Sequence, residues 1–215
     1  MRSIISLLQK VLKGKSLLPL LLISFLINQP LSADPWSDPH KSRIHLQEVD
    51  STQLFAKEHI EELNFETPEN WPIITANRQT NATGSQGKKW ESSCDGNLYA
   101  TFVTLYPKSR LNDISYALQL STISVVQALG EYGIQAKIKL ANDVMVKHKK
   151  ISSCFCEILP SLREEFCYLL IGVNLNINMT PEQTTLVPSS TSMLVEAGKE
   201  FDKEMVLKTV SCCLK

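Results

Sequence analysis

Residues 79–106 hold, within a short stretch of chain, the groups that a negatively charged ligand needs. Gly84 and Gly87 let the backbone turn closely around a ligand, and Lys88 and Lys89 supply positive charge. Loops of this kind bind phosphates and acyl phosphates through backbone N–H groups and lysines. Glycine and lysine are also common in solvated surface loops, so this stretch by itself indicates only that an anion can bind here.

A hairpin is expected to carry a second charged group. Residues 143–146 and 151–159 flank the polar turn 147–150, which is typical of two strands joined by a turn. Lys150 ends this turn, where its ammonium group would act as a point charge on a carboxylate or phosphate. The alternative is a solvated turn lysine, and the spacing alone leaves both interpretations open.

The remaining apolar patterns predict the elements that hold these two regions in place. Strands are expected at residues 44–49, 71–76, 98–106, 136–140 and 166–177, and helices at 52–63, 112–129 and 203–214. The polar stretch 180–192 is expected to be irregular. Because hairpins outnumber strand–helix–strand units in this order, we predict an α+β fold whose sheet is mixed, largely antiparallel and flanked by helices.

Composition excludes several function classes. The 215 residues carry 22 basic and 22 acidic side chains, so the chain lacks the basic excess typical of nucleic-acid-binding proteins. The six cysteines form no CxxC pair and have no zinc-site spacing with histidine. We expect them to be reduced thiols that fill space in a cytoplasmic protein.

Residues 1–33 differ in kind from the rest of the chain. Basic residues precede the apolar run 17–27, and the whole segment resembles a secretory signal. The run is short for a membrane-spanning helix and contains Pro19. We favour a non-catalytic extension or an over-long start, with membrane tethering or export as the alternative. We divide the chain into an N-terminal hydrophobic extension and linker, 1–40, and one globular domain, 41–215.

Four segments, in chain order, resemble the catalytic domain of biotin–protein ligases. The first, Val49-Asp50-Ser51-Thr52-Gln53, is similar to that family's D-S-T-N ahead of a helix. The second is similar to the motif Q-x-x-G-R-G-R-x-G-R-x-W…G-x-N-L-Y, which is matched without a gap at Gln79, Gly84, Gly87, Trp90, Gly96, Asn97, Leu98 and Tyr99.

The other two segments lie in the second half of the chain. Lys139-Leu140-Ala141-Asn142-Asp143 is similar to K-W-P-N-D, and Lys150 follows at the spacing of the family's active-site lysine. Gly172-Val173-Asn174-Leu175-Asn176-Ile177-Asn178 is similar to G-I-G-I-N-V-N. The resemblance covers about residues 44–210 and implies a class II synthetase-like fold.

The resemblance also implies a reaction and its partners. The carboxylate of biotin attacks the α-phosphate of ATP, with Mg²⁺, to give biotinyl-5′-AMP and pyrophosphate. A lysine of a biotin carboxyl carrier protein domain, of the acetyl-CoA carboxylase type, then takes the biotinyl group. These substrates are cytoplasmic, so the resemblance implies a cytoplasmic enzyme, and a membrane partner is not expected, although the signal-like N-terminal segment leaves membrane association open. The balanced charge predicts no nucleic-acid partner.

Site residues carry over from the same motifs. Lys150 is the implied catalytic residue. The resemblance assigns biotin binding to Ser51, Thr52, Gln53, Gln79, Gly84, Ser85, Tyr99, Lys150 and Ser153. It assigns nucleotide binding to Gly87, Lys88, Trp90, Asn142, Asn174 and Asn176, and a role in holding Mg²⁺ to Asp143. Without the resemblance, these residues would be interpreted as structural: a helix cap, loop residues, a turn and strand residues.

The chain departs from the family chiefly in the loop. Thr83 and Ser85 replace two arginines, and neither can make the bidentate contact of arginine to phosphate. Ser153 and Asn174 each stand where the family has glycine. These changes predict a ligase that holds its acyl-adenylate weakly or works slowly. Two alternatives stay open: a lipoate or octanoate transferase of the same fold, and a catalytically impaired biotin-binding protein.

Overall fold

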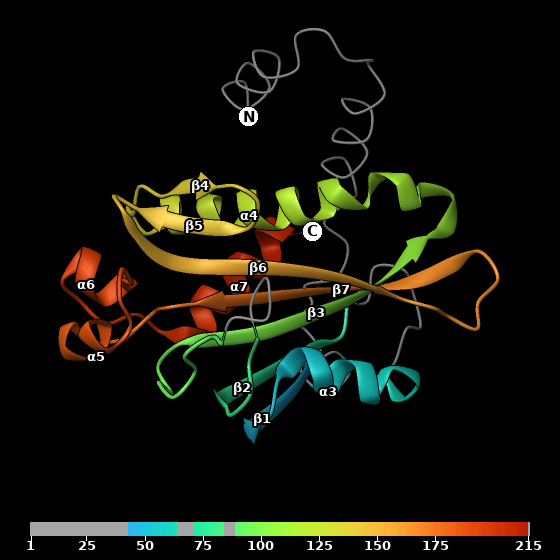
Figure 1. The fold of residues 1–215 in the computed structure, drawn as a ribbon, viewed down its shortest axis with the longest axis horizontal. Helices are drawn as coiled ribbons and strands as arrows, with labels where there is room; N and C mark the ends of the chain where they lie inside the picture. The colour runs from blue at the N-terminus through green and yellow to red at the C-terminus, as the bar shows by residue number, and fades with distance from the viewer. Residues whose placement is uncertain (1–42, 64–70, 84–88, 215) are drawn as a thin grey trace, which may run out of the picture. The chain divides into compact units, whose positions relative to one another are not determined.

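The computed structural model describes residues 43–63, 71–83 and 89–214, and the division of the chain at residue 40 lies outside them (Figure 1). A seven-stranded sheet in the order β1-β2-β3-β7-β6-β5-β4 forms the centre of this part. Its strands are β1 (Arg43–Val49), β2 (Ile73–Gln79), β3 (Leu98–Pro107), β4 (Lys137–Lys139), β5 (Asp143–Val146), β6 (Lys149–Leu159) and β7 (Phe166–Leu175).

Strand pairing confirms the predicted sheet type. Only β1 and β2 run parallel, and every other neighbouring pair of the sheet is antiparallel. The predicted hairpin around Lys150 is present as β5 and β6. Three predicted strands were too long or displaced, because β2 begins at Ile73, β4 spans only three residues and β7 ends at Leu175.

The helices connect and cover these strands. They are α3 (Thr52–Glu58), α4 (Ile114–Glu131), α5 (Pro181–Leu186), α6 (Met193–Ala197) and α7 (Lys203–Leu214), with 3-10 turns η1 (Ile60–Glu62) and η3 (Lys108–Asp113). None of the helices in the described ranges is long and apolar enough to cross a membrane.

Two helix predictions were wrong in detail. The expected helix 52–63 ends at Glu58, because His59 leaves the helical conformation and a separate 3-10 turn follows. The stretch 180–192, expected to be irregular, contains α5. Thr180 and Gln183 form a capping box there, in which each side chain accepts a hydrogen bond from the other residue's backbone N–H, and Pro181 occupies the first turn.

Alternate residues of the strands pack on opposite faces of the sheet. On one face, α4 and α7 bury a large apolar cluster that includes Phe102, Leu129, Val173 and Leu207. On the other face, α3 covers part of β2, β3 and β7, with Ala56 packed in a smaller cluster. Beside α3, this second face continues over β7, β6 and β5, the strands that follow β3 in the sheet.

Candidate active site

Strand register places polar side chains in one row across the second face of the sheet, beside α3. Asn174 of β7 lies opposite Tyr99 of β3 on one side and Ser153 of β6 on the other. Ser153 in turn lies opposite Asp143 of β5. Four residues predicted from separate motifs therefore share one row of the sheet.

Lys150 extends its ammonium group toward this row. Its Nζ lies 2.7 Å from Asp143 Oδ2, and the lysine side chain is 37% exposed. The same Nζ lies 5.9 Å from the ring centroid of Trp90. The ammonium group is thus fixed by a carboxylate and an aromatic ring, yet it stays open to an incoming ligand.

Asp143 has a second partner in the row. Ser153 donates a hydrogen bond from Oγ to Asp143 Oδ1 at 3.1 Å, and it accepts one from Asn142 Nδ2 at 3.2 Å. The Asn142 amide also donates to the Cys154 carbonyl. The serine hydroxyl therefore links Asn142, a predicted nucleotide-binding residue, to Asp143, the predicted Mg²⁺ residue. A glycine at this position would have no side chain to link them.

The backbone of Lys150 is held by a segment that the motifs did not include. Its N–H donates to the Ser189 carbonyl at 2.7 Å, and its carbonyl accepts from the Thr191 N–H at 2.9 Å. Thr191 donates its hydroxyl to Glu196 Oε1 at 2.7 Å, and Glu196 Oε2 pairs with Lys147 Nζ at 3.1 Å. Lys147 and Lys150, at the two ends of the turn 147–150, are thus both bonded to residues 189–196.

A buried amide network lies at the other end of the row. Gln79 is buried, and its Oε1 accepts hydrogen bonds from the Thr52 N–H and hydroxyl at 2.9 and 3.3 Å. Its Nε2 donates to Ser92 Oγ and Asn174 Oδ1, both at 3.2 Å. Gln79 therefore joins the start of α3 to the row on β7.

Ser51 has the role expected of a helix cap. Its Oγ accepts hydrogen bonds from the backbone N–H groups of Gln53 and Leu54, at 3.2 and 3.4 Å. This capping fixes the direction in which the first turn of α3 presents Thr52 and Gln53 to the sheet. A contact of Ser51 with biotin remains a prediction.

Gln53 reaches over the sheet from α3. Thr101 Oγ1 lies 3.3 Å from Gln53 Oε1 and 2.9 Å from Thr52 Oγ1, its other acceptor. A Cβ on Gly172 would lie only 3.0 Å from Gln53 Oε1, so a larger residue there would displace the Gln53 amide by a few tenths of an ångström. Beside Gly172, the Phe155 side chain is 38% exposed and offers an apolar surface.

An ion pair joins α3 to β6 on the same face of the sheet. Lys57 of α3 lies 2.7 Å from Glu157 of β6. Ser153, Phe155 and Glu157 alternate along β6, so the strand presents a polar, then an apolar, then an ion-paired side chain beside α3. Such a strip suits a ligand with an acyl chain and polar ends.

Tyr99 and Asn176 are placed as parts of the framework. Tyr99 is fully buried, burial raises the pKa of its phenol, and its hydroxyl donates to the Cys94 carbonyl at 3.1 Å. Asn176 is also buried, with its amide bonded to the Thr191 carbonyl and to Asn97. Asn97 Oδ1 accepts the Ile177 N–H at 2.9 Å. Ligand contacts of Tyr99 and Asn176 remain predictions.

The predicted loop is described only at its base. Thr83 and Lys89 form an antiparallel bridge, and the Trp90 N–H donates to the Ala82 carbonyl at 2.9 Å. These contacts place Trp90 beside Lys150. The predicted ligand residues Gly84, Ser85, Gly87 and Lys88 lie outside the described residues.

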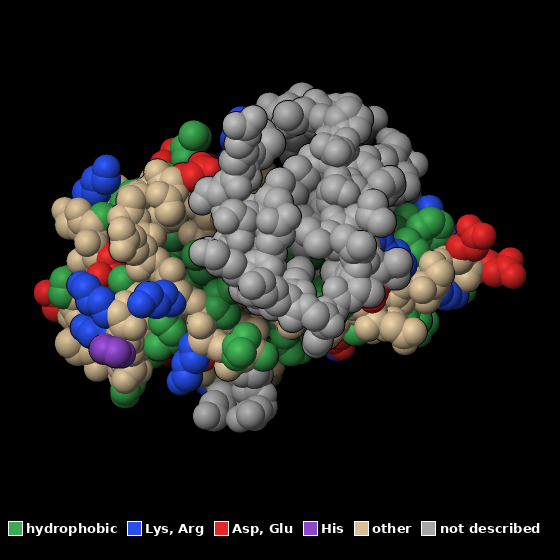
Figure 2. All heavy atoms as spheres, turned by 90° about the horizontal axis from the view of Figure 1, so that it is seen from above, with side chains coloured by type: hydrophobic (Ala, Val, Ile, Leu, Met, Phe, Trp, Pro, Cys, Tyr) green, Lys and Arg blue, Asp and Glu red, His purple; other side chains and the backbone are tan. Residues whose placement is uncertain are grey.

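Positive charge gathers around the hairpin turn. Lys147, His148 and Lys149 are exposed there. Figure 2 shows basic side chains and a histidine grouped at the end of the molecule where Figure 1 places the β5–β6 hairpin. Clustered positive charge attracts polyphosphates and speeds their association. In the described ranges, no three His, Cys, Asp or Glu residues are grouped to hold a metal ion by themselves.

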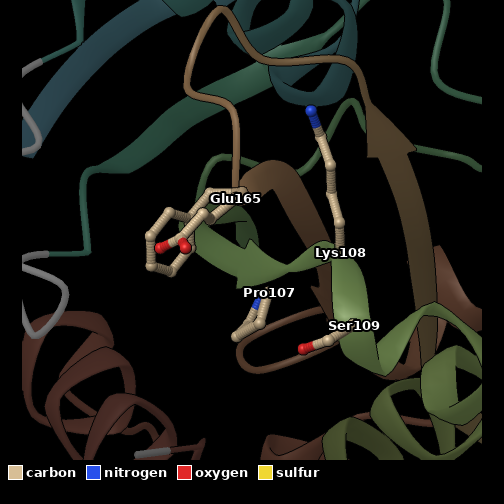
Figure 3. A pocket seen from close by; sticks show the side chains of 5 residues that line it. Pro107, Lys108, Ser109 and Glu165 are labelled. Carbon is tan, nitrogen blue, oxygen red and sulfur yellow. The ribbon is translucent and has the colours of Figure 1, made fainter.

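A separate depression lies at the opposite end of β3 and β7. It measures about 300 Å³ and is lined by Pro107, Lys108, Ser109, Glu165 and Phe166. Figure 3 shows that the Lys108 amine and the Glu165 carboxylate do not point toward each other. Pro107 pairs with Phe166 at one end of the ladder, whereas Tyr99 pairs with Asn174 near the other. The depression is therefore distinct from the candidate active site.

Some residues of the site were not predicted from the sequence. Ser92, Thr101 and Ser189 bond predicted site residues directly, and Glu196 bonds Thr191, which in turn bonds the backbone of Lys150. The alternation within residues 98–106 marks Thr101 as a strand position, but only the register shows that it lies beneath Gln53. No local pattern marks Ser189 as a partner of Lys150.

The chain is similar to known proteins over most of its length. Residues 46–176 match the model of the biotin/lipoate A/B protein ligase family. The bifunctional ligase/repressor BirA of Bacillus subtilis (strain 168) is 28% identical over 170 residues, which are 78% of this chain and 50% of that protein. The chain thus spans about half the length of this curated relative.

Solved structures give the same picture. The biotin protein ligase from Aquifex aeolicus in complex with biotin and ATP is 30% identical, with a TM-score of 0.62, covering 81% of this chain and 68% of that one. The biotin protein ligase from Leishmania major in complex with biotinyl-5-AMP has a TM-score of 0.62 at 22% identity, covering 82% of this chain and 74% of that one, which is a likeness of fold.

Proposed function

Because the chain belongs to the biotin/lipoate A/B protein ligase family, we propose that it is an ATP-dependent ligase that forms biotinyl-5′-AMP and transfers biotin to a carrier lysine. The observation that carries this proposal is the ammonium group of Lys150. It is 37% exposed and held 2.7 Å from Asp143 in the polar row, at the spacing from Asn142-Asp143 that the family motif has.

The first step needs two negative groups to meet. An oxygen of the biotin carboxylate attacks the α-phosphorus of ATP, an O–P bond forms, and the bond to the leaving pyrophosphate breaks. Carboxylate and phosphate repel each other, so a fixed cation lowers the barrier by neutralising the charge where they react. Lys150 supplies that cation, with Lys147 and Lys149 exposed nearby.

The second step consumes the adenylate. The neutral ε-amine of the carrier lysine attacks the acyl carbon, an amide bond forms, AMP leaves with the electron pair of the broken acyl–oxygen bond, and the amine loses a proton. We propose a biotin carboxyl carrier domain, of the acetyl-CoA carboxylase type, as the protein that is modified.

Magnesium would be held by few protein groups. Mg²⁺ commonly keeps water ligands and binds one or two carboxylates together with the phosphates of a nucleotide. Asp143 is a fitting single carboxylate, since among the described residues its Oδ2 pairs with Lys150 and its Oδ1 accepts from Ser153, and a carboxylate oxygen can take more than one partner. When bound, the ion would neutralise charge on the phosphates.

Location follows from the substrates. ATP, biotin and carboxylase carrier domains are cytoplasmic, so we propose that the enzyme works in the cytoplasm. Mass spectrometry of the native N-terminus would test this, since cleavage within residues 1–40 would favour export.

The direct test is a two-part assay of the purified protein. Biotin-dependent exchange of labelled pyrophosphate into ATP measures the first step, and biotin incorporation into a carrier domain measures the second. We expect both activities. Exchange without transfer would limit the protein to adenylate formation, and no exchange at any protein concentration would reject the ligase proposal.

A lipoate or octanoate ligase is the second candidate function, because the matching family includes lipoate protein ligases. The same exchange assay with lipoate or octanoate in place of biotin separates the two. We expect biotin to be the better substrate.

The sequence of the loop bears on how long the adenylate is held. With threonine at 83 and serine at 85, the loop offers hydrogen bonds where two arginines would offer charge. We therefore propose that biotinyl-5′-AMP escapes readily. The measurement is the rate at which free biotinyl-5′-AMP appears in solution, together with biotin incorporation into lysines of a bystander protein. If the enzyme keeps biotinyl-5′-AMP bound for as long as modification of the carrier takes, this proposal is contradicted.

A further inference from the structure

Exposed lysines gather at one edge of the sheet. Lys137 and Lys139 belong to β4, the last strand of the sheet, and Lys147 and Lys149 lie at the turn that joins β5 and β6. We call these four lysines the basic edge. Among the described residues, Lys147 pairs with Glu196, and the other three lysines have no ion pair. The basic side chains grouped at this end of the molecule are visible in Figure 2.

The basic edge adjoins the candidate active site. Lys139 lies opposite Asp143 in the antiparallel β4–β5 pair, so both side chains are on the same face of the sheet. Lys139 therefore continues the row of Ser153 and Asp143 out to the last strand. Lys137 lies two residues away along β4, on the same face and at a distance of about 7 Å. A molecule that approaches the row from the sheet edge meets this positive charge first.

An apolar side chain is exposed beside these lysines. Leu140 is 84% exposed and lies in the turn between β4 and β5. Lysines on an edge strand can serve to keep the sheet from pairing with another sheet, but an exposed leucine does not serve that purpose. Protein interfaces combine apolar side chains that become buried with charged groups around them. Leu140 and the basic edge together therefore fit a protein partner.

We propose that the basic edge and Leu140 form the docking surface for the carrier protein, and that the carrier presents an acidic face with an apolar side chain beside its acceptor lysine. This inference rests on the proposed ligase function and adds where the second substrate binds and by which chemistry. Transfer requires a folded domain to hold its lysine at the acyl carbon beside Lys150, so that domain must contact the surface around Lys150. Opposite charge on the two proteins speeds their encounter and fixes their orientation.

The first test uses the wild-type protein and a biotin carboxyl carrier domain that has acidic residues beside its acceptor lysine. Transfer of biotin is measured against carrier concentration at low and at high salt, and pyrophosphate exchange measures the first step under the same conditions. Salt screens charges on exposed surfaces. We expect kcat/KM for the carrier to fall roughly tenfold or more at high salt, and exchange to fall much less. An equal loss in both, or no loss for the carrier, would overturn the proposal.

The second test reverses one charge of the basic edge. Lys137→Glu should lower kcat/KM for the carrier by roughly five- to tenfold, while KM for ATP and biotin in the exchange assay stays within about twofold. Lys137→Arg keeps the charge and should keep the transfer activity. Lys108→Glu reverses an exposed charge at the opposite end of β3 and is the matched control. If KM for ATP rises as much as KM for the carrier, or if Lys108→Glu loses more transfer activity than Lys137→Glu, the proposal is wrong.

Leu140 is tested separately, because its contribution is apolar. Leu140→Ser should lower kcat/KM for the carrier by roughly fivefold and leave its salt dependence and the exchange activity unchanged. The side chain is almost fully exposed, so the substitution should leave the fold intact. Transfer at the wild-type rate would remove Leu140 from the docking surface.

A charge exchange between the two proteins examines the contact itself. Replacing an acidic residue beside the carrier's acceptor lysine with lysine should weaken transfer by the wild-type enzyme. The same carrier variant should partly restore transfer by Lys137→Glu, since the two charges are again opposite. If none of the carrier's acidic positions gives such a restoration, the carrier does not dock on the basic edge.

The outcomes separate this inference from the proposed function. A wild-type protein without biotin-dependent exchange rejects both. Exchange without transfer to the carrier domain rejects the carrier as the partner, and this inference with it. Exchange and transfer that are both unaffected by Lys137→Glu leave the ligase function standing and reject the docking surface alone.

Discussion

The two faces of the sheet use the same strands for different purposes. Facing α4 and α7, the strands contribute an almost continuous apolar layer, in which Phe102 is fully buried. Facing α3, the next residue of the same strand is Thr101, which is equally buried but bonded to Thr52. Apolar burial drives folding on the first face. The second face has a smaller apolar cluster under α3, but around Thr101 its buried positions form hydrogen bonds that fix polar groups in place.

The difference between these faces suggests how the molecule separates stability from chemistry. Substitutions on the α4 face should change the free energy of unfolding and leave the reaction unaltered in the molecules that stay folded. Substitutions of the polar site residues on the α3 face should do the reverse. Four substitutions examine this contrast.

Lys150→Ala should have the largest effect. It removes the cation proposed to act on the reacting carboxylate and phosphate, and loss of one such electrostatic group costs about 10²–10³ in kcat. We expect biotin-dependent pyrophosphate exchange to become undetectable, with little change in the thermal unfolding midpoint. Lys149→Ala, at the adjacent exposed position, is the control and should retain most of the activity. Unchanged exchange in Lys150→Ala would remove its catalytic role.

Phe102→Ala examines the other face. Truncating a fully buried phenylalanine costs about 3–5 kcal/mol of folding free energy, because it leaves a cavity and removes apolar burial. Urea unfolding should show a lower midpoint, while activity per folded molecule stays near that of the wild type. A stable variant with an altered KM for biotin would contradict the separation of the two faces.

Thr101→Val tests the neighbouring residue on the site face. Valine keeps the shape of threonine but removes the hydroxyl that bonds Thr52. Thr52 and Gln53 therefore lose the hydrogen-bond donor that holds them against the sheet. We expect KM for biotin to rise about three- to tenfold, from the loss of one hydrogen bond of about 1 kcal/mol, with a smaller change in kcat. An effect on unfolding as large as that of Phe102→Ala, with KM unchanged, would argue against this role.

Glu196→Gln should have the smallest effect. The amide can still accept from the Thr191 hydroxyl, but the ion pair with exposed Lys147 is lost. Exposed ion pairs contribute about 0–1 kcal/mol, so kcat should fall no more than about threefold, at unchanged KM. The salt dependence of kcat between low and high ionic strength gives a second measurement, since the wild-type value should fall toward that of the variant. A rise in KM for biotin instead would place Glu196 in ligand binding.

The sequence was sufficient to predict the sheet type and the hairpin that carries Lys150. Alternation and turn residues act locally, so they can be recognised in a single sequence. Motif spacing also predicted Asp143, Ser153 and Asn174, which the structure brings into one row with Lys150 beside it, and Asn142, which hydrogen-bonds to Ser153.

Other parts of the site depend on contacts between residues far apart in the chain. Ser189 accepts a hydrogen bond from the Lys150 N–H, and Gln79 donates one to Asn174. Each bond joins two segments that come together only when the whole fold has formed. The position of the Gln53 amide depends on Thr101 and Gly172, which are far from it in the chain and close to it only in the fold. Helix α5 was overlooked because its capping residues surround a segment with no apolar periodicity.

The central ladder between β3 and β7 has a consequence for how the protein folds. Residues 108–165, which include α4 and strands β4 to β6, lie between these two strands in the chain. Their pairing must therefore close a long loop, and contacts of this kind slow folding because chain entropy is lost before the pairing is gained. Tyr99 and Asn174 meet across this ladder, so we expect ligand binding to appear only in the final, slowest phase of refolding.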